Sequence, residues 1–194
     1  MKRPIEKPSE PIMRFFSPEF YMQFNSHDDD VADRANAAWE KSLKRYKRHL
    51  ADIRDRMPSQ VRKLSELCLH DAEVLGFEQE SQSFCPVSQG VSSAPLWSAL
   101  AIVTLRQDAT IRSLFYMLWD RVRQYPPNNE WPFSKTRKHW LYDEVDVAAD
   151  QRGLFLHRIL FSDGSVVEIP FVSVVPSSIT LPTGNESVIA KRIA

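Results

Sequence analysis

Apolar residues recur at helical spacing in the first third of the chain. Over residues 26–57 they are three or four positions apart, so they lie on one face of a predicted helix. These residues are Trp39, Leu43, Tyr46, Leu50, Ile53 and Met57. Aspartates at 28–30 stand at its start, where carboxylates accept from free amides and complement the helix dipole. Pro58 interrupts the pattern, and we expect Ser59 to cap a second helix that ends near Leu69.

From about residue 71 the pattern changes to short apolar stretches that suit β-strands. The clearest is 155–174, a hairpin whose turn at 162–165 contains Asp163-Gly164, a dipeptide that favours positive φ. Further strands are expected at 72–78, 96–105, 111–120 and 140–147, with loops at 80–95 and 125–138. The segment 111–120 also fits a helical period, but we favour a strand there.

Helices followed by strands predict an α+β fold, with N-terminal helices packed on a mostly antiparallel sheet of about five to six strands. The chain of 194 residues suits one domain. We expect a disordered leader over 1–12, a helical segment over 13–70, an antiparallel β segment of the same domain over 71–175, and a flexible tail over 176–194.

Composition excludes several classes of function. Acidic and basic residues both number 25, so no long-range field gathers nucleic acid or acidic membranes. The five glycines are far apart, which excludes a P-loop, a dinucleotide fingerprint and a nucleophile elbow. With no long apolar run and two cysteines, we expect a cytoplasmic protein without a membrane partner. Cys68 is expected in the core.

The most distinctive local feature is His70-Asp71, at the expected corner between helix and strand. We favour a corner held by side-chain hydrogen bonds, with a partner contact as a second interpretation. The dyad also resembles that of metal-dependent HD phosphohydrolases, with His49 as the upstream ligand. That family is all-helical around its dyad, whereas strands follow here. A zinc site from Cys68, His70, Cys85 and a distant histidine matches no structural zinc spacing well.

The loop before the fourth expected strand is rich in aromatic residues. Large rings on a loop are typical of residues that anchor protein–protein interfaces. The partner-binding candidates are therefore Tyr125, Trp131, Phe133 and Trp140. The alternative is that Trp131 and Phe133 fold back into the core. The sequence leaves these two interpretations open.

Two charged runs complete the candidates. The basic run Lys44–Arg48 surrounds Tyr46 and, with the basic residues at 135–138, would suit an RNA-associated protein, but we favour a solvated helix face. An acidic set could bind a divalent cation and comprises Asp143, Glu144, Asp146, Asp150 and Glu168. For these carboxylates a solvated strand face is favoured.

Three segments, at 13–21, 69–74 and 156–164, resemble a group of small bacterial proteins of unknown function. More loosely, they resemble immunity-like proteins of polymorphic toxin systems. The resemblance implies a bacterial α+β protein without an established activity, and it supplies no catalytic residues to carry over. We therefore expect a non-enzymatic module that binds another protein, an immunity-like protein being one form, with no cofactor and no bound metal. The alternative is a metal-dependent hydrolase centred on His70 and Asp71.

Overall fold

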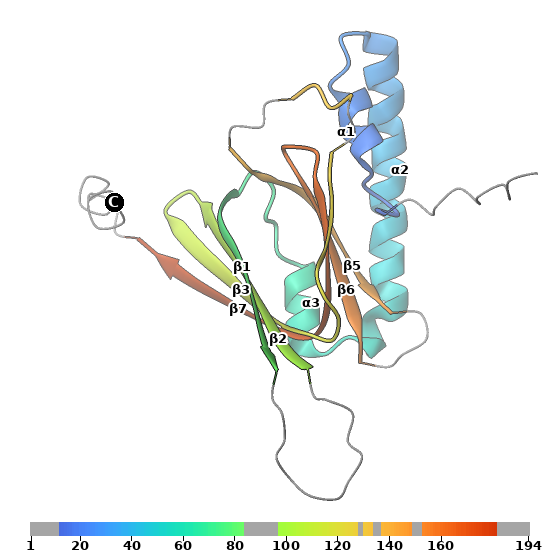
Figure 1. Ribbon diagram of the computed structural model, residues 1–194. Coiled ribbons are helices and arrows are strands. Elements are labelled where there is room, and N and C mark those ends of the chain that lie inside the picture. The colour runs from blue at the N-terminus through green and yellow to red at the C-terminus, as the bar shows by residue number, and fades with distance from the viewer. Residues whose placement is uncertain (1–11, 84–96, 128–129, 134–136, 149–152, 182–194) are drawn as a thin grey trace, which may run out of the picture.

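The chain folds into helices packed on a curled antiparallel sheet, which confirms the predicted α+β class (Figure 1). The computed structural model describes residues 12–83, 97–127, 130–133, 137–148 and 153–181. The expected leader, apart from Ile12, lies outside the described residues, as does the end of the expected tail from residue 182. Among the described helices, none has both the length and the apolar character needed to cross a membrane.

The helices of the described residues all precede the sheet in the chain. They are α1 (Pro18–Phe24), α2 (Asp29–Ile53), the 3-10 turn η1 (Arg54–Arg56) and α3 (Ser59–Ser65). The side chain of Asp28 caps α2 by accepting from the amide of Val31 at 3.2 Å, as the acidic start predicts. The second expected helix is shorter than predicted, because α3 ends at Ser65 rather than near Leu69.

The strands of the described residues form one sheet. They are β1 (Glu73–Ser83), β2 (Trp97–Gln107), β3 (Thr110–Leu118), β4 (Arg123–Tyr125), β5 (Trp140–Val147), β6 (Phe155–Phe161) and β7 (Val166–Thr180). The order across the sheet is β1-β2-β3-β7-β6-β5, and β4 also pairs with β7. All pairs are antiparallel. The preference for a strand over 111–120 is confirmed by β3.

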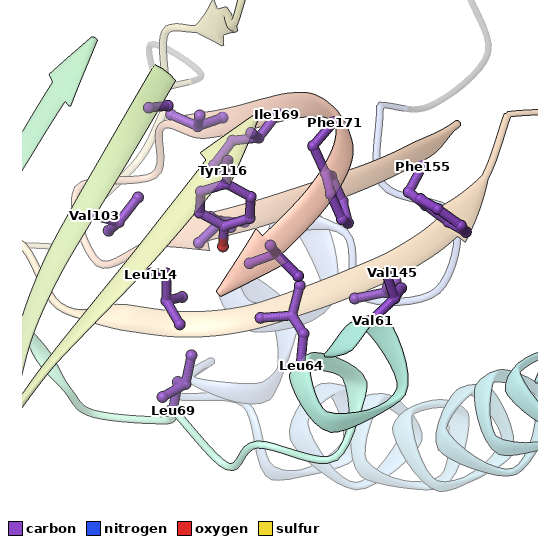
Figure 2. Packing of buried hydrophobic residues seen from close by; sticks show 14 of the residues in the cluster. Val61, Leu64, Leu69, Val103, Leu114, Tyr116, Val145, Phe155, Ile169 and Phe171 are labelled. Carbon is purple, nitrogen blue, oxygen red and sulfur yellow. The ribbon is translucent and has the colours of Figure 1, made fainter. Parts of the chain in front are cut away.

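The sheet curls until its two outer strands meet at their first residues. The amide of Val74 donates to the carbonyl of Lys138 at 2.8 Å, and the amide of Trp140 donates to the carbonyl of Ala72 at 2.9 Å. Curling encloses an apolar interior between the strands. Val61 and Leu64 of α3 point from the helix toward side chains of the sheet (Figure 2). Burial of this interior supplies the main stabilisation of the fold.

A second apolar cluster lies between the helices and the other face of β5 and β6. Figure 1 shows α2 running beside these two strands, with α1 against its first half. The cluster contains Met13, Phe15, Phe16, Tyr46, Trp131, Leu141, Leu160 and Val166. The hydroxyl of Tyr46 accepts from the amide of Val145 at 2.7 Å, so α2 also satisfies a buried donor of β5.

Two strands extend well beyond their predicted ends. β1 continues to Ser83, where a loop was expected from residue 80, and β7 continues to Thr180, where a tail was expected from residue 176. In both cases the extra residues are mostly polar but pair with a neighbouring strand: Glu80 with Leu100, and Thr180 with Thr110. Pairing satisfies their backbone groups, which a pattern of side chains cannot reveal.

Candidate functional site

An aromatic pocket opens between α1, α2 and β5. It has a volume of about 140 Å³ and is lined by Phe20, Tyr21, Phe24, Asn36, Trp39 and Tyr142. The rings of Trp39 and Tyr142 have centroids 4.3 Å apart, and those of Tyr21 and Tyr142 are 6.0 Å apart. Phe24 is 49% exposed, so one wall of the aromatic pocket faces solvent.

Local sequence signals place each wall of this pocket. Pro18 stands at the first position of α1, where its fixed φ suits a helix start, and the short helix presents Phe20, Tyr21 and Phe24. Helical spacing of three brings Asn36 and Trp39 to one side of α2. In β5 the register shifts between Trp140 and Tyr142, so Trp140 enters the interior while Tyr142 packs with the outer cluster.

The aromatic loop reaches the pocket through Tyr21. Trp131 stacks on Tyr21 with centroids 5.6 Å apart, and Phe133 meets the same ring edge-on at 5.1 Å. Trp131 is only 5% exposed, and its indole Nε1 donates to the carbonyl of Ser162 at 3.0 Å. Of the two open interpretations, the structure places Trp131 in the core. Phe133 is half-buried at its edge.

The His70-Asp71 corner lies beside the same pocket. The ring of His70 is 5.4 Å from that of Tyr142, and its Nδ1 lies 2.8 Å from a carboxylate oxygen of Asp71. Asp71 adopts a left-handed φ of 64°, and its side chain is 76% exposed. Burial raises the pKa of the Tyr21 hydroxyl, and the negative charge of Asp71 raises it further. The carboxylate therefore acts electrostatically on the pocket wall.

Carboxylates are frequent in the two helices that line the pocket. Residues 18–40, the acidic segment, hold one arginine and six exposed acidic side chains: Glu19, Asp28, Asp29, Asp30, Asp33 and Glu40. The neutral total charge of the chain hides this local excess. A surface of this sign attracts cationic groups.

The other two aromatic candidates, Trp140 and Tyr125, do not line the aromatic pocket. Trp140 is completely buried in the interior, where its Nε1 donates to Asp143 at 2.9 Å. Tyr125 is half-buried and ends β4. The sequence thus identified Phe133, His70 and Asp71, which lie beside the pocket, but not the residues that line it. The aromatic-rich stretch at 13–21 was a signal for Tyr21, whereas Trp39 was assigned only to the packed helix face.

The acidic strand was predicted wrongly as a solvated face. Glu144 is 1% exposed and accepts from the amides of Arg14, Phe15 and Phe16 at 2.9, 2.5 and 2.7 Å. Burial raises its pKa even though these three donors favour the ionised form. Glu168 is also buried and accepts from Arg158 and Arg123. These two carboxylates join separate segments of the fold through their hydrogen bonds. Asp150 lies outside the described residues.

The same strand supplies a buried polar chain in the interior. Tyr116 lies 2.8 Å from Nδ1 of His157, whose Nε2 lies 3.0 Å from Asp143. Burial raises the pKa of Tyr116 well above its ordinary value, with a smaller contribution from Asp143. Tyr116 and His157 have no exposed surface, so this chain of hydrogen bonds orders the core.

The residues of the alternative metal site do not gather. His49 pairs with Asp146 at 2.9 Å rather than with His70. Within the part of the chain that the structure describes, no three His, Cys, Asp or Glu side chains could together hold a metal ion. Cys68 is exposed rather than in the core, because α3 ends before it; Cys85 lies outside the described residues. The basic side chains around Tyr46 are exposed, as expected of a solvated helix face.

Comparisons place no known protein beside this chain. No family model, curated protein or solved structure matches it. The resemblance to immunity-like proteins therefore stays a prediction, and the function must be argued from the aromatic pocket and its surroundings.

Proposed function

We propose that this chain is a non-enzymatic module that binds another protein through the surface around the aromatic pocket. The observation that carries the proposal is the meeting of two separately predicted candidates, Phe133 and the His70-Asp71 corner, at Tyr21 and Tyr142. Half-exposed aromatic rings beside polar groups are typical of interface hot spots. An immunity-like role is one form of this proposal, in which the partner would be a toxin.

Other features of the surface agree with binding through this region. Phe24 is one of the large apolar side chains that the described chain leaves exposed, and it stands at the rim of the pocket. The acidic segment around it would give the contact a preferred sign of charge. Several other exposed apolar side chains lie on the strands β2, β3 and β7, and they provide a second surface against which the proposal can be tested: Leu100, Met117, Val175 and Ile179.

We expect Phe24→Ser to weaken partner binding at least tenfold, because it removes a rim ring, while Met117→Ser leaves binding within twofold. The two positions are matched, since Phe24 is 49% and Met117 is 52% exposed. The measurement is the amount of a single stoichiometric protein that co-purifies with each tagged variant, followed by its affinity for the purified chain. Loss of that protein with Met117→Ser and not with Phe24→Ser would place the contact on the sheet and contradict the proposal.

A further inference from the structure

We propose that the aromatic pocket receives an arginine side chain from a basic segment of the partner. This inference rests on the proposed function and names the group that the pocket recognises. A pocket of about 140 Å³ holds one side chain, whereas cofactor and drug-sized ligands occupy about 300 Å³ or more. The size of the space therefore favours insertion of a single residue.

The chemistry of the walls favours a cation. Five of the six lining residues are aromatic, and the faces of such rings attract a positive charge within about 6 Å. None of the six carries a positive charge that would repel it. Trp39 and Tyr142 lie at an interplanar angle of 41° with centroids 4.3 Å apart, so their two rings form one angled wall.

Negative charge stands beside the walls. The largely exposed carboxylate of Asp71 lies 2.8 Å from Nδ1 of His70, whose ring is 5.4 Å from that of Tyr142. Burial raises the pKa of both Tyr21 and Tyr142, and the charge of Asp71 adds to both shifts. The acidic segment extends this field along α1 and the first half of α2. An incoming basic segment would thus be attracted before contact and meet a carboxylate beside the pocket.

Arginine fits these walls better than lysine. Its guanidinium is planar, stacks on aromatic faces and is more weakly hydrated than an ammonium, so it costs less to transfer from water to a ring surface. It also has five donors, which suit the side-chain oxygen of Asn36 in the lining and the carboxylate of Asp71. Lysine would satisfy the charge but not the stacking.

The test uses three short peptides with acetylated and amidated ends, Gly-Arg-Gly, Gly-Lys-Gly and Gly-citrulline-Gly. Citrulline has nearly the shape of arginine without its charge, so it is the matched control for the ligand. Each peptide is titrated into the full chain while the side-chain signals of Trp39 are followed by NMR. We expect saturable shifts with the arginine peptide and about tenfold weaker binding of the citrulline peptide.

Variants of the chain supply the second control. Asp71→Asn keeps a residue that tolerates the left-handed backbone and removes the charge, so arginine affinity should fall about threefold or more. Phe24→Ala should weaken binding of the arginine peptide by a larger factor than Asp71→Asn does. Met117→Ala should leave the affinity for this peptide unchanged. Equal affinity for arginine and citrulline, tighter binding of lysine, no saturable shift, or unchanged binding in Phe24→Ala would each overturn the inference.

The peptide titration and the co-purification fail independently. If the peptides do not bind but Phe24→Ser still removes the partner, this inference is wrong and the proposed function stands. If the arginine peptide binds at the pocket but Phe24→Ser leaves the partner in place, the pocket is a cation site and the proposed function is wrong.

Discussion

Replacing Gly164 with alanine is expected to destabilise the fold by about 3 kcal/mol, from backbone strain and a steric clash together. Gly164 has a φ of +80°, which L side chains rarely adopt, and an added Cβ would lie 2.7 Å and 2.9 Å from two ring atoms of Trp131. Trp131 is buried and stacks on Tyr21, so it cannot move without disturbing a wall of the aromatic pocket. The measurement is the unfolding free energy from denaturant titration.

Gly153→Ala separates the two causes. Gly153 has nearly the same φ, +82°, but nothing lies within 4 Å of an added Cβ. Only backbone strain applies there, and the expected cost is about 1 kcal/mol. If the two variants lose the same stability, the ring of Trp131 does not pack closely against Gly164. The described contact between the β6–β7 hairpin and the aromatic pocket would then be wrong.

Replacing Glu144 with alanine is expected to cost about 4 kcal/mol. The buried backbone amides of Phe15 and Phe16, and the amide of Arg14, then have no acceptor. The segment that they belong to buries Met13, Phe15 and Phe16 against α2 and the sheet. Amide hydrogen exchange over residues 14–16 should become much faster than in the wild type. A loss below about 1 kcal/mol with unchanged exchange would contradict this role.

Glu144→Gln serves as the control, because it keeps one carbonyl acceptor and removes the ionisable group. Since burial raises the pKa of Glu144 above its ordinary 4.5, the folded chain keeps the proton to a higher pH than the unfolded chain does. The contribution of Glu144 is therefore fully present below about pH 4.5 and declines as the pH rises through the folded pKa. Wild-type stability relative to Glu144→Gln should decline in that direction; a rise would contradict it.

Much of the fold follows from local patterns. The 3.6 period gave α2, the turn residues Asp163 and Gly164 gave the β6–β7 hairpin, and alternation gave β5 with its observed bounds. Patterns failed where pairing between distant segments decides the outcome. The polar ends of β1 and β7 are strands because β2 and β3 satisfy their backbones. The curl that joins the first residues of β1 and β5 is likewise a property of the whole sheet.

The site was predictable only in part, for a related reason. His70, Asp71 and Phe133 could be named because each carries a local signal. Tyr21 and Trp39, in contrast, come from two helices that meet Tyr142 of β5, a strand about 100 positions further along the chain. The carboxylates of β5 misled for the opposite reason. The strand pattern predicts that Glu144 is solvated. Its hydrogen-bond donors are backbone amides of a segment about 130 positions earlier in the chain. Burial of a charge depends on partners that alternation along a strand cannot identify.

Amide hydrogen exchange of the chain with and without its captured partner tests the central claim, that the surface around the aromatic pocket binds another protein. The account predicts slower exchange over α1 and the first half of α2, residues 18–40, and at the His70-Asp71 corner. Exchange in β2 and β3 should stay unchanged. Slower exchange confined to β2 and β3, with residues 18–40 unaffected, would contradict the account.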